Sequence, residues 1–504
     1  MKVYLIGAGP GDPGLFTLRG KEILGRADVV VYDYLANSAF LDFVRPDAEV
    51  IYAGKKGGDH TLSQEEINEL IVKKARSGKM VARLKGGDPY LFGRGGEEAE
   101  ELVDAGVDFE VVPGVTSGIA SAAYAGIPLT HRSFASSVIL ATGHEGVGKS
   151  ESALNWDALA KSGSTLVFYM GMKNLPEICS RLLAAGLPAR TPAAVVRWGT
   201  TPRHESLVST VKQLPADVDK QGFTAPALII IGKVVKLREK LNWFEKRPLL
   251  GRNIVVTRAR EQSSEIANLL AAYGANVIQF PTIEIKKLDD YSEVRKVLNY
   301  LGSYDWVAFT SANAVRFFWD QLYAIGKDSR ALSSCKVAAI GPATAQALKS
   351  RGVRADFVPE RFVAESVVKG LSAIGVKDKR ILIPRARAAR DVLPEQLGAA
   401  GACVEVLPMY ETVPSEARKD EVLELLEAGR LDCITFGSSS TVDNFMDLVA
   451  PALLKEHQEL RYACIGPITA KTLEKYGLVC DFQPTDYTIP ALVEILAKNL
   501  CKTS

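Results

Sequence analysis

The chain has 504 residues, of which 47% are hydrophobic and 24% charged, a composition typical of globular proteins rather than disordered or fibrous ones. This length favours roughly three domains, and the net charge of +2 argues against a strongly basic nucleic-acid-binding protein. No apolar run approaches the ~18 residues that cross a bilayer, and the seven cysteines are scattered without a CxxC pair. We therefore expect a cytoplasmic protein with no membrane segment, no nucleic-acid partner and no metal site.

Short apolar strands alternate with helices through the first half of the chain. A helix after residue 62 is indicated by Ser63 as its N-cap and Glu66 three residues later, which is the pattern of a capping box. The alternation predicts an α/β fold, and the length of this half favours two α/β lobes with a cleft between them. Strands are predicted at 2–6, 29–32, 80–84, 109–112, 137–142, 164–170, 193–197 and 227–231.

A glycine-rich segment, KGGDPYLFGRGGEE at 85–98, follows the predicted strand at 80–84. Open α/β sheets bind ligands at the carboxyl ends of their strands, so this loop is a candidate binding site. Glycine clusters also form ordinary turns, and the spacing alone does not decide between the two. An earlier loop, GAGPGDPG from Gly7, has Asp12 where GxGxxG needs its third glycine, so a nicotinamide site is disfavoured.

The segment GHEGVGKS at 143–150 matches the P-loop pattern GxxxxGK[ST]. A P-loop also requires a helix that opens at its lysine and a magnesium-binding aspartate after the next strand. The following residues SESALNW stay polar, and the strand LVFYM ends without an aspartate. We therefore interpret this segment as a surface loop rather than a nucleotide site.

The second half contains an internal repeat. Residues 254–284 match 381–411 without a gap, 306–318 match 433–445 in the same register, and 338–359 match 463–484 after a small indel. The repeat predicts two similar β/α lobes. In each, a strand ends at small hydroxyl residues or at a GPxT turn that opens a helix. Helix N-termini attract carboxylates or phosphates, so two facing lobes are suited to hold a polyanion.

Known families carry these motifs in this order. The blocks VYLIGAGPGDPGLFTLRG, GGDPYLFGRGGEE, PGVTSG, GIPLTHR and TLVFYMG resemble the uroporphyrinogen-III C-methyltransferases of the tetrapyrrole methylase family, over residues 1–241. Tyr90 and Trp198 are minor departures from its commonest pattern. The blocks VTRAREQ, FPTIEI, FTSANAV, IGPATAQAL, FGSSSTV and IGPITAKTLEKYG are similar to uroporphyrinogen-III synthase, over 251–504. A charged stretch with a proline supplies the linker, which we place at 242–250.

The resemblance implies a bifunctional enzyme of tetrapyrrole biosynthesis. Its second half would cyclise hydroxymethylbilane to uroporphyrinogen-III, and its first half would methylate that product at C2 and C7 with S-adenosylmethionine to give precorrin-2. The family also implies a homodimer formed through the methyltransferase half. An alternative is a methyltransferase for another corrinoid intermediate, joined to a non-catalytic tetrapyrrole-binding module. The sequence does not distinguish the cobalamin from the sirohaem pathway.

The same resemblance assigns roles to individual residues. Asp33 matches the family's proton acceptor and Lys55 its proton donor. The S-adenosylmethionine pocket is implied at Pro10, Gly86, Gly87, Asp88, Leu91, Thr116, Ser117, Met170 and Gly199. Uroporphyrinogen-III bears eight carboxylates, so cations near the strand ends are candidate substrate ligands; these are Lys55, Lys56, Arg83, Lys85, Arg94, His131 and Arg132. Arg94 is the one that we select.

In the synthase half the resemblance implies no indispensable acid or base. Positions similar to its cleft-lining groups are Ser311, Thr344, Tyr410, Ser438, Ser439 and Thr469, with the register between Ser438 and Ser439 open. Tyr410 is either a weak acid for the departing hydroxyl or an aromatic that packs near a crossover. The family fold makes lobe one discontinuous, with residues 251–282 and 411–504, and places lobe two at 283–410.

Overall fold

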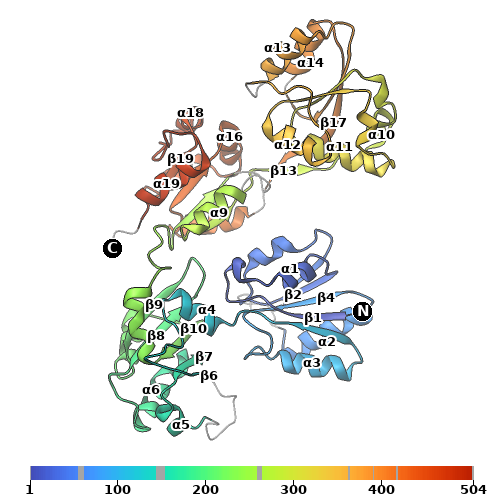
Figure 1. The fold of residues 1–504 in the computed structure, drawn as a ribbon. Coiled ribbons are helices and arrows are strands. Elements are labelled where there is room, and N and C mark those ends of the chain that lie inside the picture. The colour runs from blue at the N-terminus through green and yellow to red at the C-terminus, as the bar shows by residue number, and fades with distance from the viewer. Residues whose placement is uncertain are drawn as a thin grey trace.

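The computed structural model describes residues 2–54, 62–143, 154–257, 264–360, 364–389, 391–415 and 418–501 (Figure 1). Lys55, Lys56 and residues 144–150 of the P-loop-like segment lie outside the described residues. Within these ranges, no helix is both long enough and apolar enough to cross a membrane.

The N-terminal lobe, called lobe A here, is a parallel five-stranded sheet in the order β3-β2-β4-β1-β5. Successive residues of its central strands face opposite layers: Val3 and Leu5 pack with α2 and α3, whereas Ile6 packs with α1. A sheet covered on both faces needs apolar residues on both faces of its strands. The elements are β1 (Lys2–Gly7), α1 (Leu18–Leu24), β2 (Val29–Tyr32), β3 (Glu49–Tyr52), α2 (Gln64–Arg76), β4 (Val81–Lys85), α3 (Gly95–Asp104) and β5 (Asp108–Val112).

The next lobe, lobe B, is a mixed sheet in the order β6-β7-β10-β8-β9, in which only β6 and β7 are parallel. Its central strand ALIII is almost wholly buried, and α4 packs on the face beside β7 and β10. The elements are α4 (Ser117–Tyr124), β6 (Val138–Thr142), α5 (Trp156–Lys161), β7 (Thr165–Tyr169), α6 (Leu175–Ala184), β8 (Pro192–Arg197), β9 (Glu205–Thr210), α7 (Leu214–Gln221), β10 (Ala227–Ile231) and α8 (Arg238–Leu241).

The predicted α/β class of this half is confirmed, and each predicted strand is present within one or two residues of its expected bounds. The predicted capping box is also present: Ser63 Oγ accepts from Glu66 N, and the Glu66 carboxylate accepts from Ser63 N. Two strands were not predicted, β3 and β9. Both lie at the edges of their sheets and are partly exposed, so their sequences EVIY and ESLVST lack a continuous apolar run.

The second half contains the predicted pair of repeated β/α units. One sheet, in the order β12-β11-β18-β19, is entirely parallel and combines strands from both sides of the intervening unit; we call this unit lobe one. The repeat is exact enough that Ala338 bridges Phe357 while Ala463 bridges Phe482. The elements of lobe one are β11 (Asn253–Val256), α9 (Ser264–Ala272), β12 (Asn276–Gln279), α15 (Lys419–Glu427), β18 (Cys433–Phe436), α16 (Ser439–Leu448), α17 (Pro451–Lys455), β19 (Arg461–Cys464), α18 (Pro467–Lys475) and α19 (Ile489–Asn499).

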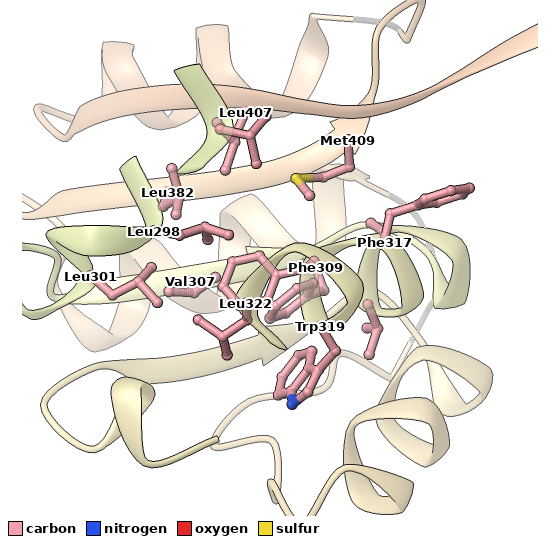
Figure 2. Close-up of a cluster of buried hydrophobic side chains, with 14 of the residues drawn as sticks. Leu298, Leu301, Val307, Phe309, Phe317, Trp319, Leu322, Leu382, Leu407 and Met409 are labelled. Atoms are coloured by element: carbon pink, nitrogen blue, oxygen red, sulfur yellow. The ribbon is translucent and has the colours of Figure 1, made fainter. Parts of the chain in front are cut away.

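Lobe two has the sheet order β13-β17-β16-β14-β15. Figure 2 shows part of its core, with Phe309 of β14 beside Trp319 of α11. The centroid of the Phe309 ring lies 5.1 Å from that of Phe318 and 5.8 Å from that of Trp319. The elements of lobe two are β13 (Ile283–Lys286), α10 (Ser292–Asn299), β14 (Trp306–Phe309), α11 (Ala312–Ala324), β15 (Lys336–Ala339), α12 (Pro342–Ser350), α13 (Ala364–Ile374), β16 (Arg380–Ala386), α14 (Val392–Ala399) and β17 (Cys403–Pro414).

A two-stranded ribbon joins lobes one and two. The first part of β17 pairs in parallel with β16, whereas its end pairs antiparallel with β13, with Ile283 opposite Pro414 and Lys286 opposite Glu411 (Figure 1). β12 runs into this ribbon from lobe one and β17 runs into it from lobe two. Because the other strands are parallel to these, the carboxyl ends of both sheets point toward the ribbon.

Residues 242–250, which connect the two halves, pack at both ends. Phe244 is buried against Tyr124, with ring centroids 4.7 Å apart, and the neighbouring Glu245 carboxylate accepts four hydrogen bonds. Its donors are His204, Ser206, Arg238 and Asn242. At the other end Leu249 lies in the core of lobe one, where its N–H donates to Tyr273 O at 3.0 Å. The connection is therefore a folded segment anchored on each side.

Candidate functional site

Three loops of lobe A meet through their backbones. Gly9 and Gly87, from the loops after β1 and β4, exchange hydrogen bonds of 2.7 and 3.0 Å. Gly7 and Gly114 pack against each other and against the carbonyl oxygen of Gly87, so a Cβ at either position would overlap main-chain atoms of the other loops. Glycine is required here because only a residue without Cβ allows this approach. The glycines of the predicted binding loops therefore join the carboxyl ends of β1, β4 and β5.

Asp88 fixes two of these loops. Its Oδ1 accepts from Tyr90 N at 2.8 Å, as in an ordinary Asx turn, and its Oδ2 accepts from Gly114 N at 3.0 Å. Each carboxylate oxygen can accept a further hydrogen bond. The bonds that shape the turn therefore also hold the carboxylate in position between two of the loops.

Lobe B brings further predicted residues to the start of α4. Tyr169 Oη lies 2.8 Å from Thr116 Oγ1 and accepts from Gly118 N at 2.9 Å, which ties the end of β7 to this helix. Gly199, after β8, packs so closely on Ser121 of α4 that a Cβ there would overlap it. Ser117 is the first residue of the helix, and Met170, directly after β7, is half exposed.

The backbone is strained where these elements end. Met170, Trp198 and Thr200 have φ angles of 54°, 48° and 71°, and none is a glycine. Left-handed conformations of such residues cost on the order of 1–3 kcal/mol each, and they concentrate at functional sites because the surrounding structure enforces them. Thr200 is nearly buried, and its Oγ1 accepts from Asp12 N at 3.2 Å, which connects this turn of lobe B to the first glycine loop.

The other predicted pocket residues lie around these loops. Gly86 approaches Leu35, where a Cβ would lie 2.6 Å from the leucine Cβ. Leu91 packs against the cluster of lobe B that contains Tyr169, and Pro10 is half buried in the first loop. The structure therefore brings together residues from five separate stretches of chain.

A buried charge network lies beneath this region. Arg83 donates to Asp33 Oδ2 at 3.0 Å and to Glu98 Oε1 at 3.3 Å, while Lys85 donates to the same Glu98 oxygen at 2.5 Å. Gln64 Nε2 also donates to it at 3.0 Å. The side chains of Arg83, Lys85 and Glu98 are at most 5% exposed, whereas that of Asp33 is 26% exposed. Asp33 is thus the open end of an otherwise buried network.

This network corrects the expected role of two cations. Arg83 and Lys85 lie two residues apart on β4, so their side chains point to the same side of the sheet, and both bind the buried Glu98 carboxylate instead of being available to substrate. Burial, with the nearby Arg83 charge, lowers the pKa of Lys85 below its ordinary 10.5. Glu98 was not predicted as their partner. The sequence did indicate such a partner, because two inward-facing cations on a buried strand require a buried carboxylate.

Arg94, the selected substrate cation, forms a surface ion pair. It donates to Glu97 at 2.6 to 3.1 Å, and both side chains are 53% exposed. Arg94 also has a left-handed φ of 56° at the start of α3. Lys55, the expected proton donor, lies outside the described residues.

In lobe two, the predicted polar residues gather where the parallel strands end. Ser311 caps α11 by accepting from Ala314 N at 3.0 Å, and its Oγ lies 3.0 Å from Tyr410 Oη. Phe317 stacks on the Tyr410 ring at 5.4 Å. Burial raises the pKa of Tyr410 above its ordinary 10, so its hydroxyl stays protonated at neutral pH. Thr344, in the first turn of α12, is 3% exposed.

Lobe one repeats this arrangement and resolves the serine register. Ser438 caps α16 as Ser311 caps α11, with φ angles of −167° and −161°. Ser439 instead donates to Ile468 O at 3.3 Å and accepts from Thr472 at 2.9 Å, so it joins α16 to α18. Ser438 is therefore the counterpart of Ser311. Thr469, the counterpart of Thr344, is 4% exposed.

Two family models match the chain in sequence. Residues 2–215 match the tetrapyrrole (corrin/porphyrin) methylases, and residues 264–494 match uroporphyrinogen-III synthase HemD. A uroporphyrinogen-III C-methyltransferase of Synechocystis sp. is 51% identical over 50% of this chain and 95% of its own length. The crystal structure of a uroporphyrin-III C-methyl transferase from Thermus thermophilus, complexed with S-adenyl homocysteine, covers 47% of this chain and all of that one at 39% identity and a TM-score of 0.40.

One relative spans both halves. The porphyrin biosynthesis protein HemD of Ruminiclostridium josui is 38% identical over 501 residues, which is 99% of each chain. The two units match the two family models in the same order, and the match continues through the connection between them. The chain therefore belongs to the porphyrin biosynthesis proteins that join a tetrapyrrole methylase to a uroporphyrinogen-III synthase.

Proposed function

We propose that this chain converts hydroxymethylbilane to precorrin-2 in two stages. The second half cyclises hydroxymethylbilane to uroporphyrinogen-III, and the first half methylates that product at C2 and C7 with S-adenosylmethionine. The observation that carries the proposal is the end-to-end match to a porphyrin biosynthesis protein, together with two family models whose activities are consecutive. We assign the methyltransferase to residues 1–241 and the synthase to 251–504.

The residues around the glycine loops fit S-adenosylmethionine chemically. Asp88 offers carboxylate oxygens for ribose or amino groups, Thr116 and Ser117 offer hydroxyls, and half-exposed Met170 offers an apolar contact. Glycine backbones at 86 and 87 allow the close approach that such a ligand needs. When bound, S-adenosylmethionine supplies a methyl group made electrophilic by its sulfonium. We propose that Pro10, Leu91 and Gly199 complete this pocket.

Asp33 is suited to take up a proton. Methylation of an electron-rich pyrrole carbon leaves a cation that is quenched by proton loss, and a carboxylate beside the ring can accept that proton. Arg83 holds Asp33 Oδ2, and Leu35 N donates to Oδ1 at 3.1 Å, so the carboxylate is fixed before substrate arrives. We propose Asp33 as the proton acceptor and, from the family, Lys55 as the donor.

In the synthase, the main task is to hold a flexible linear tetrapyrrole while its ring closes. Hydroxyls and helix N-termini at Ser311, Ser438, Thr344 and Thr469 are suited to bind its carboxylates. Tyr410 Oη, which stays protonated, is suited to assist departure of the hydroxyl group. The tyrosine's partner, Ser311, keeps that hydroxyl in one orientation.

A two-stage assay tests this function. The full chain receives hydroxymethylbilane alone, and then hydroxymethylbilane with S-adenosylmethionine; we expect uroporphyrinogen-III in the first and precorrin-2 in the second. Asp33→Ala should abolish methylation while cyclisation continues. Ligand binding without cyclisation would instead favour a non-catalytic tetrapyrrole-binding module in the second half.

We also propose, from the family alone, a cytoplasmic homodimer formed through the methyltransferase half. Light scattering of the full chain tests the dimer, because a mass of about twice 54.5 kDa is expected. A monomeric mass would contradict it.

A further inference from the structure

An arginine is held at the junction of lobes A and B by an aromatic ring. The Arg203 guanidinium lies over the Trp198 ring, 3.9 Å from its centroid. Trp198 follows β8 of lobe B, and its ring meets Tyr34 of lobe A at 5.9 Å in an edge-on contact. Tyr34 directly follows Asp33 in the chain. The stack therefore bridges the two lobes.

The turn that carries Arg203 is fixed by its own hydrogen bonds. Thr201 Oγ1 donates to Trp198 O at 2.8 Å and accepts from Arg203 N at 3.2 Å. The next residue, His204, is buried and bonded to Glu245. Hydrogen bonds therefore hold the backbone on both sides of Arg203, and stacking on the Trp198 ring orients its guanidinium.

This cation has no carboxylate partner within the part of the chain that the structure describes. Three other cations near the glycine loops differ in this respect: Arg83 and Lys85 are buried in the Glu98 network, and Arg94 is paired with Glu97. Arg203 is exposed. A guanidinium that is pre-positioned by stacking and keeps its hydrogen-bond donors free is suited to bind a carboxylate bidentately.

We propose that Arg203 binds a carboxylate of the tetrapyrrole substrate and that Trp198 is its positioning residue. The inference rests on the proposed methyltransferase function and names a substrate contact for it. A substrate with eight carboxylates requires cations, and this one stands at the junction of both lobes, on a ring that contacts the residue after Asp33. Arg203 thus contributes to substrate affinity, whereas Asp33 contributes to the chemical step.

Steady-state kinetics of the full chain with uroporphyrinogen-III test the inference. Arg203→Gln should raise KM for uroporphyrinogen-III roughly tenfold, because one charge-assisted hydrogen-bonded pair is lost. The kcat and the KM for S-adenosylmethionine should stay within about twofold, since neither reports this contact. Arg203→Lys, which keeps the charge without the planar fork, should lie between the wild type and Arg203→Gln. The dependence of KM on ionic strength should also weaken in Arg203→Gln.

Trp198→Leu separates positioning from binding. It should raise the same KM, and combining it with Arg203→Gln should add little, because both changes remove one interaction. The matched control is Arg190→Gln, an exposed arginine before the opposite end of β8, which should behave as the wild type. An unchanged KM for uroporphyrinogen-III in Arg203→Gln overturns the inference, as does a fall in kcat alone. A wild-type chain that does not methylate uroporphyrinogen-III overturns the proposed function itself.

Discussion

Replacing Glu98 with glutamine tests the buried charge network most directly. In the wild type one carboxylate oxygen accepts from Lys85, Arg83 and Gln64, and the side chain is 1% exposed. Glutamine preserves the shape and one acceptor oxygen but removes the charge. Arg83 keeps Asp33 as a partner, whereas Lys85 loses its only carboxylate among the described residues.

The expected loss of stability follows from the fate of the Lys85 proton. An unpaired buried cation costs about 3–5 kcal/mol, but the lysine can instead lose its proton, at a cost of about 4 kcal/mol near pH 7.5 for an ordinary pKa of 10.5. We therefore expect a destabilisation of about 3–4 kcal/mol at that pH. Burial already lowers the pKa of Lys85. Since the unfolded chain then binds more protons than the folded one, stability of the variant rises with pH, by up to about 1.4 kcal/mol per unit below the ordinary pKa.

Calorimetric unfolding of the full chain at several pH values from about 7 to 9 measures this effect. The unfolding transition of the methyltransferase half is the one whose temperature rises on addition of S-adenosylhomocysteine, because the proposed function requires that half to bind this ligand. Glu97→Gln is the matched control: it breaks the neighbouring exposed ion pair and should cost less than about 0.5 kcal/mol. Unfolding of Glu98→Gln like that of Glu97→Gln, or a loss of stability that grows as the pH rises, would contradict the predicted role of the Glu98 charge.

Three further changes have distinct expected outcomes. Gly114→Ala places a Cβ against the carbonyl oxygen of Gly87 and should lower the stability of the methyltransferase by about 1–3 kcal/mol and abolish methylation, while the rate of uroporphyrinogen-III formation is kept; normal methylation would contradict the packing. Tyr410→Phe should slow cyclisation roughly 100-fold if the hydroxyl is the acid, with a stability loss of only about 1 kcal/mol from the lost Ser311 bond, and an unchanged rate would assign the ring to packing alone. Burial raises the pKa of Glu245, but the hydrogen bonds that its carboxylate accepts hold that pKa well below the ordinary 4.5. The carboxylate therefore stabilises the fold fully above about pH 4.5, and this stabilisation is lost as the pH falls. Glu245→Gln should flatten that part of the pH–stability curve, and a curve like that of the wild type would rule out this role of the carboxylate.

Much of the architecture is determined locally and could be predicted from sequence. Buried strands are recognised as apolar runs, and amphipathic helices by the period of their apolar residues, because burial acts on each segment's own side chains. The repeat in the second half likewise predicts two similar units before any contact is known. The edge strands β3 and β9 were not predicted for the same reason, since half-exposed segments need no continuous apolar run.

The positions of the glycine loops and of the strands that precede them follow from the amino-acid sequence alone. Asp33 and the 85–98 loop could be identified in this way, but the contacts of the charged and polar side chains around them could not. Whether Arg83 faces substrate or Glu98, whether Ser438 or Ser439 caps its helix, and whether Arg203 has a partner depend on contacts between segments far apart in the chain. Only the tertiary structure decides these, because the charge of a side chain is local whereas its partner and its solvent exposure are set by the packing of the whole domain.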